Sequence, residues 1–287
     1  MWGALLLVMR VPWSLRLAGV PLVLPLLMWQ PLRPDMGQFE LLAADVGQGN
    51  AVVVRTARHT LVYDAGPSYG RDVDAGHRVL VPLLRAWDEQ VDMLMLSHRD
   101  LDHVGGAPAV LAMQPQAALW ASIEPTHPLQ ALRPATRCEA GQSWVWDGVR
   151  FDILHPLAAD YDRSQKPNAM SCVLRIASAA QAATQADIPA AHHTPGGRVA
   201  LLVGDIERQQ EKALLARGAD LRADFLLIPH HGSKTSSTAA FLDAVQPVLA
   251  VAQTGYRNRF GHPAPQVMAR YVARGVQVRD SVQCGAF

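Results

Sequence analysis

Ser97-His98-Arg99-Asp100-Leu101-Asp102-His103 places two imidazoles and two carboxylates within the six residues that begin at His98. The segment follows an apolar run from Val91 to Leu96 and precedes Gly105-Gly106. Ordinary hydrogen bonds to solvent would explain one loop histidine. Imidazole and carboxylate are ligands that divalent ions used for hydrolysis prefer. The pattern His-x-Asp-x-Asp-His at the end of an apolar strand therefore favours a metal site over a solvated polar loop.

Three further motifs narrow this interpretation. They are Asp45-Val46-Gly47-Gln48-Gly49, Gly204-Asp205 and Pro229-His230-His231-Gly232-Ser233. With the first motif they resemble the C-terminal metallo-β-lactamase-like domain of the ComEC family of DNA-uptake (competence) channel proteins, from about Glu40 to the C-terminus. Any one of the short motifs alone would be weak, but their order is specific.

The resemblance implies two divalent metal ions, Mn²⁺ or Zn²⁺, held by His98, Asp100, Asp102, His103, Asp205 and His262. His98 and Asp100 would serve one ion, and Asp102 and His103 the second. Asp205 would bridge them, and His262 would be the last histidine ligand. Asp100 departs from the usual pattern, which has a second histidine there. The usual third-motif histidine also has no clear counterpart, because Asn168 and Ser171 occupy that neighbourhood. A site richer in oxygen makes Mn²⁺ a serious competitor of Zn²⁺.

The segment Pro229 to Ser237 delivers two histidines, a lysine and several hydroxyls to one loop. Hydroxyls and a lysine suit a phosphate. We expect a catalytic set of Asp102, His230, His231 and Lys234, and substrate contacts from Ser233, Thr235, Ser236, Arg257 and Arg259. Either histidine could bind metal, donate a proton or hold the phosphate. Because neighbouring side chains on a strand point opposite ways, only one of the pair is expected to face the metals.

Two carboxylates end predicted strands on the same side of the sheet, Asp45 and Asp64. They are predicted to orient ligand histidines, with Asn168 and Ser171 in similar supporting positions. A purely structural role for either aspartate is the alternative.

The amino-acid composition of the chain excludes few classes of function. The net charge of +1 gives no global basic field of the kind that coats nucleic acid, although a local groove remains compatible. Cys138, Cys172 and Cys284 are odd in number and widely spaced, which predicts buried free thiols and neither a zinc knuckle nor a disulfide framework.

Residues 1–34 differ from the rest, since only Arg10 and Arg16 are charged before Leu32. No signal-peptide cleavage pattern is present, and the second apolar run is short for a full span of roughly 20 residues. We interpret the segment as the end of a membrane region, with Trp13 and Trp29 near the ends of its last helix. The alternative is an apolar leader buried against the domain.

Residues 38–287 are predicted to form the hydrolase domain. Strand-like runs include 39–43, 51–54, 61–63, 91–97 and 172–176, and Asp147-Gly148 predicts a hairpin turn. Residues 177–197 are interpreted as a long loop in which His192 and His193 are solvated. The fold expected is α/β, a metallo-β-lactamase-like four-layer αββα sandwich preceded by a short apolar membrane-derived segment.

The predicted function is a metal-dependent nuclease. The resemblance implies the nuclease domain of a DNA internalisation channel that degrades the strand not taken up during natural transformation. Its implied partners are DNA, the channel part of the same polytopic protein, the inner membrane and other DNA-uptake proteins, with the domain on the extracytoplasmic side. The alternatives are hydrolysis of a small ester or lactone on the same fold, or a non-catalytic DNA-guiding module.

Overall fold

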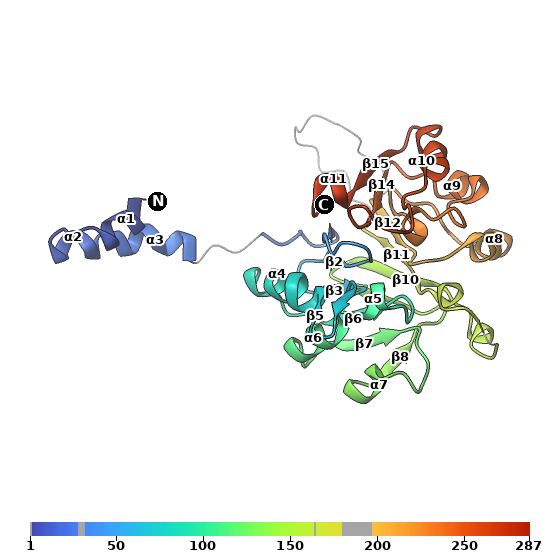
Figure 1. Ribbon diagram of the computed structural model, residues 1–287, viewed down its shortest axis with the longest axis horizontal. Coiled ribbons are helices and arrows are strands. Elements are labelled where there is room, and N and C mark those ends of the chain that lie inside the picture. The colour runs from blue at the N-terminus through green and yellow to red at the C-terminus, as the bar shows by residue number, and fades with distance from the viewer. Residues whose placement is uncertain (1, 28–31, 164, 180–196) are drawn as a thin grey trace. The chain divides into compact units, whose positions relative to one another are not determined.

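The computed structural model describes residues 2–27, 32–163, 165–179 and 197–287 (Figure 1). The chain forms two compact units, Met1–Leu32 and Arg33–Phe287. The predicted solvated pair His192 and His193 lies outside the described residues.

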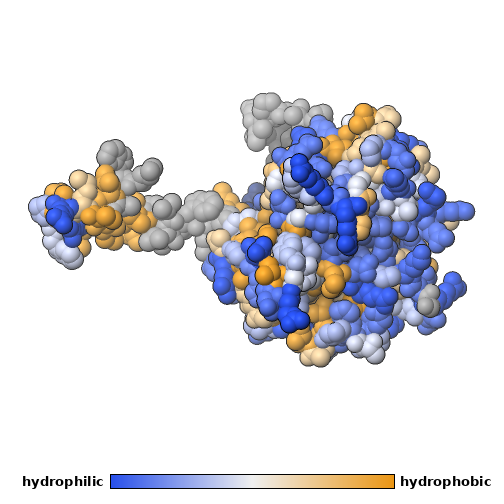
Figure 2. All heavy atoms as spheres, viewed as in Figure 1, coloured by the Kyte–Doolittle hydropathy of each residue, from blue (hydrophilic) through white to orange (hydrophobic). Residues whose placement is uncertain are grey.

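The first unit is a small group of helices, α1 (Trp2–Val8), α2 (Trp13–Leu17) and α3 (Gly19–Leu27), in which α1 lies against α3. Apolar residues dominate its visible surface (Figure 2). Arg16 belongs to α2, and its guanidinium donates to the carbonyl of Met9. None of the described helices is both long and apolar enough to cross a bilayer. The membrane-derived segment therefore stays a prediction.

The second unit contains two mixed sheets. The first sheet has the order β1-β2-β3-β6-β7-β8, antiparallel from β1 to β3 and parallel from β3 to β8. Its strands are β1 (Glu40–Ala43), β2 (Val52–Arg55), β3 (Thr60–Tyr63), β6 (Met93–Leu96), β7 (Ala118–Ala121) and β8 (Ala135–Arg137). A separate small hairpin consists of β4 (Ser68–Gly70) and β5 (Val73–Asp74).

The second sheet has the order β15-β14-β13-β12-β11-β10-β9, parallel from β12 to β15. Its strands are β9 (Ser143–Trp146), β10 (Val149–His155), β11 (Val173–Ala177), β12 (Val199–Leu202), β13 (Phe225–Leu227), β14 (Leu249–Ala252) and β15 (Gln277–Asp280). Asp147 and Gly148 both have positive φ, 50° and 83°, and join β9 to β10. The predicted hairpin turn is confirmed, because a two-residue turn that matches strand twist needs two such residues.

Helices cover the outer face of each sheet (Figure 1). The first sheet carries a π-helical turn (Gly76–Leu80), α4 (Val81–Ala86), α5 (Leu101–Val104), α6 (Ala107–Met113) and α7 (Leu129–Leu132). The second carries α8 (Arg208–Ala216), α9 (Ala239–Val245), α10 (Pro265–Val272) and α11 (Ser281–Cys284). The 3₁₀ turns Ala158–Asp160, Pro167–Met170 and Pro229–Gly232 lie in connections.

Three apolar clusters define four layers. Alternation along β2 shows this directly: Val53 packs with Leu84 and Val110 of the helices, whereas Val52 packs with Phe151 and Leu202 of the other sheet. The third cluster joins the second sheet to α8, α9 and α10. The αββα sandwich predicted from the sequence is therefore the fold of the second unit.

Cys138 and Cys172 form a disulfide, so the prediction of free thiols at these positions is wrong. Cys138 follows β8 of the first sheet and Cys172 precedes β11 of the second, and packing of the sheets brings their Cα atoms to 6.0 Å. Spacing along the chain does not reveal this proximity. Cys284 is a free thiol but is exposed rather than buried.

Candidate metal centre

The candidate site lies where parallel strands of both sheets end. Asp64 follows β3, His98 follows β6, Asp205 follows β12 and His231 follows β13. The carboxyl ends of parallel strands gather their loops on one edge. Each sheet therefore contributes polar side chains to a common position between the layers.

Asp64 is fully buried and orients the first motif. Its carboxylate accepts hydrogen bonds from the amide of Ser97 (2.6 Å), the hydroxyl of Ser97 (2.8 Å) and Nδ1 of His103 (2.8 Å). β3 and β6 are neighbours in register, which brings the end of one strand beside the end of the other. The predicted supporting role of Asp64 therefore matches its position.

His98 and His231, like His103, each place Nδ1 next to a hydrogen-bonding oxygen. Nδ1 of His98 lies 3.0 Å from the hydroxyl of Ser97, which already donates to Asp64. Nδ1 of His231 donates to the carbonyl of Gln253 at 2.9 Å. Nδ1 of each ring thus faces an oxygen, which directs Nε2 into the site as the nitrogen available to a metal.

Four buried atoms meet in the site without a well-formed hydrogen bond: Nε2 of His98, His103 and His231, and Oδ1 of Asp205. Nε2 of His103 and of His231 make only ion-pair contacts, at 3.2 Å to Asp205 and 3.4 Å to Asp102. Buried polar atoms are rarely left unpaired, and each costs about 1–3 kcal/mol. Two groups bring ligand atoms within 4.8 Å of one another, His98-His103-Asp205 and Asp102-His103-His231. Divalent cations fit this donor set, since two imidazoles and a carboxylate occur at catalytic zinc sites.

The charges of the site reinforce one another. Burial acts to raise the pKa of Asp102, but the hydrogen bond from His231 and the charge of His103 hold it at about 2. Burial acts to lower the pKa of His103, yet Asp205 and Asp64 raise it well above its usual value. Burial likewise opposes the ionised form of Asp205, and the charges of His103 and His231 hold its pKa well below its usual value. The carboxylates are thus ionised and attract positive charge.

The two adjacent histidines do not point opposite ways. His230 and His231 have φ of 50° and 53°, in the left-handed region, so they form a turn rather than the end of a strand. Nε2 of each ring lies 3.6 Å from Asp205. Only His231 belongs to a candidate ligand group, which agrees with the expectation that one of the pair faces the metals, although a left-handed turn rather than strand alternation separates their roles. His231 is buried, whereas His230 is partly exposed and lies 3.4 Å from Glu207 and 3.4 Å from Asn168.

His231, not His262, completes the second group of ligands. The ring of His262 lies 6.4 Å from that of His231 and 5.7 Å from that of His230, and its Nδ1 is buried without a partner. Burial and the two neighbouring histidines lower the pKa of His262 to about 4. Asp100 lies at the rim, with Oδ2 3.5 Å from Nε2 of His98, and stands outside both groups.

The position of the missing histidine is occupied by a serine. The Ser171 hydroxyl accepts from the Asp205 amide (3.0 Å) and lies 3.4 Å from Nδ1 of His98. His155, the nearest histidine upstream, directs Nε2 to the carbonyl of Ala169. Ser171 therefore connects two ligands without entering the site itself.

The predicted phosphate loop divides into two parts. Lys234 and Thr235 are exposed, and the hydroxyls of Ser233 and Thr235 lie 3.0 Å apart. Ser236 is buried and its hydroxyl donates to the carbonyls of Pro229 and Ser233, so its assignment to substrate binding is corrected to a structural role. Arg257 and Arg259 are exposed and lie over the rings of Tyr256 and Phe260.

Asp45 does not reach a histidine in the described residues. It is exposed and accepts from the amide of Gly47, which corrects its assignment as a supporting carboxylate. The motif around it acts instead through close packing. Gly49 has φ of 144°, and a Cβ there would lie 2.2 Å from the carbonyl oxygen of Asp102. Only glycine allows this approach to the metal loop.

Sequence reasoning missed Ser97, Gln253 and Glu207. Ser97 bonds Asp64 and approaches both histidines of the first motif, and Gln253 also bonds the backbone of Ala44 and Ala51. Glu207 accepts from Thr235 at 2.8 Å and faces His230. Its place two residues after Asp205 is a signal that could have identified it.

Comparison with known proteins agrees with this geometry. The model of the metallo-beta-lactamase superfamily matches residues 44–131. Competence protein ComA of Neisseria gonorrhoeae is 34% identical over 99% of this chain and 37% of its own length. Recombination protein 2 of Haemophilus influenzae is 31% identical over 85% of this chain and 28% of its own. The chain thus spans about a third of the length of these curated relatives.

A solved structure of a putative metal-dependent hydrolase from Parabacteroides distasonis shares the fold. Its TM-score is 0.51 at 12% identity, over 86% of this chain and 95% of that one. This likeness concerns the fold alone, whereas the sequence identity of the relatives extends over nearly the whole chain. The chain therefore carries a metallo-β-lactamase superfamily domain and is similar, over about a third of their length, to competence proteins of the ComA/ComEC family, as its motifs predicted.

Proposed function

We propose that this chain is the metal-dependent DNA phosphodiesterase part of a DNA-uptake protein, and that it degrades the strand that is not transported. The superfamily supports a metal-dependent hydrolase. The name of the relative from Neisseria gonorrhoeae supports a role in competence. DNA as substrate, and the other uptake proteins as partners, belong to the proposal.

One observation carries the hydrolytic part. Three buried imidazoles each engage Nδ1 with an oxygen and leave Nε2 unpaired beside the unpaired Oδ1 of Asp205. Nε2 of His103 lies 3.2 Å from this oxygen and Nε2 of His231 lies 3.6 Å from it, so the potential ligand atoms converge on one place. Divalent ions, Mn²⁺ or Zn²⁺, would be held by His98, His103, His231, Asp102 and Asp205. When bound, such ions supply a water of lowered pKa and polarise a phosphoryl oxygen.

The remaining polar groups suit a phosphodiester. His230 is the partly exposed imidazole at the mouth, held near Asp205 and Glu207, and is positioned to donate a proton to a leaving oxygen. Lys234 and the hydroxyls of Ser233 and Thr235 are suited to hold phosphate oxygens. The exposed Arg257 and Arg259 would add backbone contacts.

The disulfide supports an extracytoplasmic position. Disulfides persist in oxidising compartments and are rare in the cytosol. The bond between Cys138 and Cys172 is therefore compatible with a domain on the outer side of the inner membrane. The segment of residues 1–34 would then belong to the membrane channel of the same protein, which the proposal includes as a partner.

The test is cleavage of end-labelled single-stranded and double-stranded oligonucleotides by the full chain in mild detergent, with Mn²⁺ or Zn²⁺ titrated after chelation. Asp102→Ala removes a metal ligand and should lower cleavage by at least about 100-fold. The matched control is Asp45→Ala, which removes an exposed carboxylate outside the ligand groups and should keep full activity.

Each outcome has a definite meaning. Cleavage that is metal-dependent, lost in Asp102→Ala and kept in Asp45→Ala supports the proposal. If metal binds but neither oligonucleotide is cut, the phosphodiesterase is refuted and a small ester or lactone becomes the substrate to test. A chain that binds no metal and still binds DNA would be the guiding module.

A further inference from the structure

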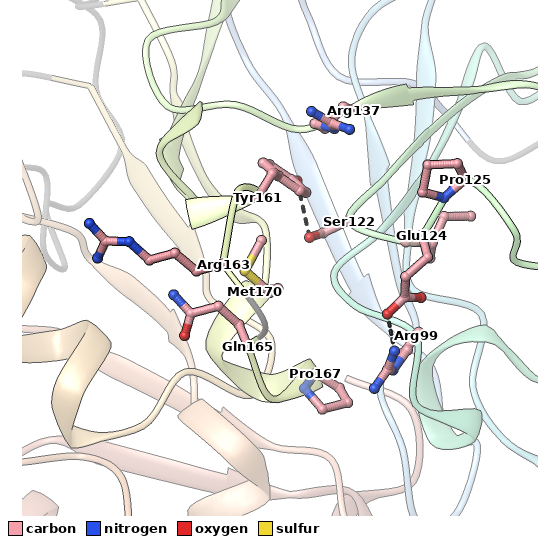
Figure 3. Close-up of a pocket in the computed structure, with 11 residues that line it drawn as sticks. Arg99, Ser122, Glu124, Pro125, Arg137, Tyr161, Arg163, Gln165, Pro167 and Met170 are labelled. Atoms are coloured by element: carbon pink, nitrogen blue, oxygen red, sulfur yellow. Dashed lines mark hydrogen bonds and ion pairs between the residues drawn. The ribbon is translucent and has the colours of Figure 1, made fainter. Parts of the chain in front are cut away.

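A cavity of about 280 Å³ lies outside the ligand groups described above. We call it the arginine cavity and define it by Arg99, Ser122, Glu124, Arg137, Tyr161 and Arg163. Figure 3 shows Arg137 and Tyr161 on one side of the opening and Arg99 with Glu124 on another, while the side chain of Arg163 extends outward from the rim. The volume is at the small end for ligand sites, which run from about 300 Å³ upward. It suits one unit of a polymer better than a large cofactor.

The cavity adjoins the metal centre at three points of the chain. Arg99 follows His98 directly. Pro167 and Met170, which also line the cavity, precede Asn168 and Ser171. Consecutive Cα atoms are about 3.8 Å apart. The lining of the cavity is therefore continuous along the chain with His98 and with the segment that contains Asn168 and Ser171.

Its charge is positive. Glu124 forms an ion pair with Arg99, which leaves the positive charges of Arg137 and Arg163. Within the described part of the chain, neither of these two has a carboxylate partner, and both are exposed. Two exposed guanidinium groups around a hollow are suited to phosphate oxygens, which they bind through paired N–H donors.

The cavity also offers a rigid aromatic surface. The hydroxyl of Tyr161 lies 2.7 Å from the carbonyl of Cys138 and 3.0 Å from the hydroxyl of Ser122, which fixes the ring. The Arg137 guanidinium lies over this ring at 4.4 Å. Unstacked bases bind to aromatic rings and arginine planes, so this pair could receive a base as well as a phosphate.

The hollow continues along the surface. A second hollow of about 380 Å³ shares Ile123, Pro125 and Arg137 with the first. Arg137 therefore stands between two connected depressions. Two adjoining hollows that share an arginine fit an extended strand better than a compact small molecule.

We infer that the arginine cavity binds a nucleotide of a single-stranded DNA substrate beside the scissile phosphate, with Arg137 and Arg163 on the backbone. This inference rests on the proposed function and specifies its substrate as an unpaired strand. The duplex is the poorer ligand, since its bases are stacked on one another and cannot lie against Tyr161.

The first test measures binding without turnover. The full chain carrying Asp102→Asn is titrated with a fluorescein-labelled ten-residue oligothymidylate, with and without Arg137→Ala and Arg163→Ala together. The double change should weaken binding at least tenfold. It should also reduce the slope of log K against log salt by about 1.4, since each phosphate contact on a single strand contributes about 0.7.

The matched control removes two arginines elsewhere on the same unit. Arg222 and Arg279 are exposed and outside the cavity, so changing both to alanine alters the net charge by the same amount. Affinity and salt slope should stay at the value of the parent. An equal loss in both double variants, or no loss in either, would overturn the inference. Thermal unfolding of each variant checks that it folds.

A second test separates this inference from the proposed function. Bis(p-nitrophenyl) phosphate has one phosphodiester and no flanking nucleotide, so the double change should lower oligonucleotide hydrolysis relative to it by at least tenfold. If neither compound is hydrolysed, the proposed function fails while the binding test still decides on the cavity. If the double change lowers the hydrolysis of the oligonucleotide and of bis(p-nitrophenyl) phosphate equally, the cavity does not bind the strand.

Discussion

Replacing Asp64 by asparagine should lower the affinity of the site for metal while the chain still folds. Asp64 accepts three hydrogen bonds, two from Ser97 and one from His103. Asparagine has one carbonyl oxygen, so its NH₂ group must face either the Ser97 amide or Nδ1 of His103. The backbone tolerates the change, because Asp64 has φ of 58° and asparagine also adopts the left-handed region readily.

The magnitude follows from these contacts. If the amide faces the His103 ring, Nδ1 must accept and the proton moves to Nε2, which then cannot bind metal. If it faces the Ser97 amide instead, a buried donor loses its acceptor at a cost of about 1–3 kcal/mol. Loss of such a supporting carboxylate lowers metal affinity typically by about 10–100-fold, or roughly 1.4–2.7 kcal/mol.

The assay is competition between the metal-free chain and a chromophoric chelator for Zn²⁺ or Mn²⁺, with urea unfolding measured in parallel. Asp45→Asn is the matched control, because Asp45 also follows a strand but bonds only its own loop. It should bind metal as the unchanged chain does. An Asp64→Asn protein that folds and keeps full affinity would refute the assignment of His103 as a ligand held by Asp64.

Three further predictions concern the packing at Gly49, the disulfide bond and the effect of metal on stability. Gly49→Ala should destabilise the fold by more than about 1 kcal/mol and weaken metal binding, because its Cβ would meet the Asp102 backbone. Gly47→Ala isolates the backbone strain, because its Cβ would lie 3.9 Å from the Tyr69 ring, an ordinary contact distance. Cys138→Ser with Cys172→Ser should lower the free energy of unfolding by about 3–4 kcal/mol in urea, and an unchanged value in the oxidised chain would argue against the bond. Metal at 100 times its dissociation constant should stabilise the chain by about 2.7 kcal/mol, or raise Tm by roughly 5–10 °C in calorimetry, and a Tm independent of metal would count against the centre.

Sequence patterns predicted those parts of the site that follow directly from strand ends. His98, Asp102 and His103 lie after an apolar strand, and Asp205 lies after another, so their meeting on one edge could be expected. The same pattern predicted equal roles for Asp45 and Asp64, because each follows a predicted strand. They differ because β3 adjoins β6, whereas β1 is at the sheet edge with β2 and β3 between.

Other parts depend on geometry that no local pattern contains. The roles of His231 and His262 depend on a left-handed turn at His230-His231. Gln253 acts through its backbone carbonyl, which any residue could supply. The disulfide depends on how the two sheets pack, and a prediction from cysteine spacing misses such a pair.

The division of the ligands between the two sheets has a consequence for biosynthesis. His98, Asp102 and His103 come from the first sheet, while Asp205 and His231 come from the second, much later in the chain. A nascent polypeptide that ends before residue 205 lacks both Asp205 and His231, so neither ligand group is complete, even with its first sheet formed. A complete set of ligands is thus assembled late, after both layers have formed, and a truncated translation product cannot hold metal through either complete group.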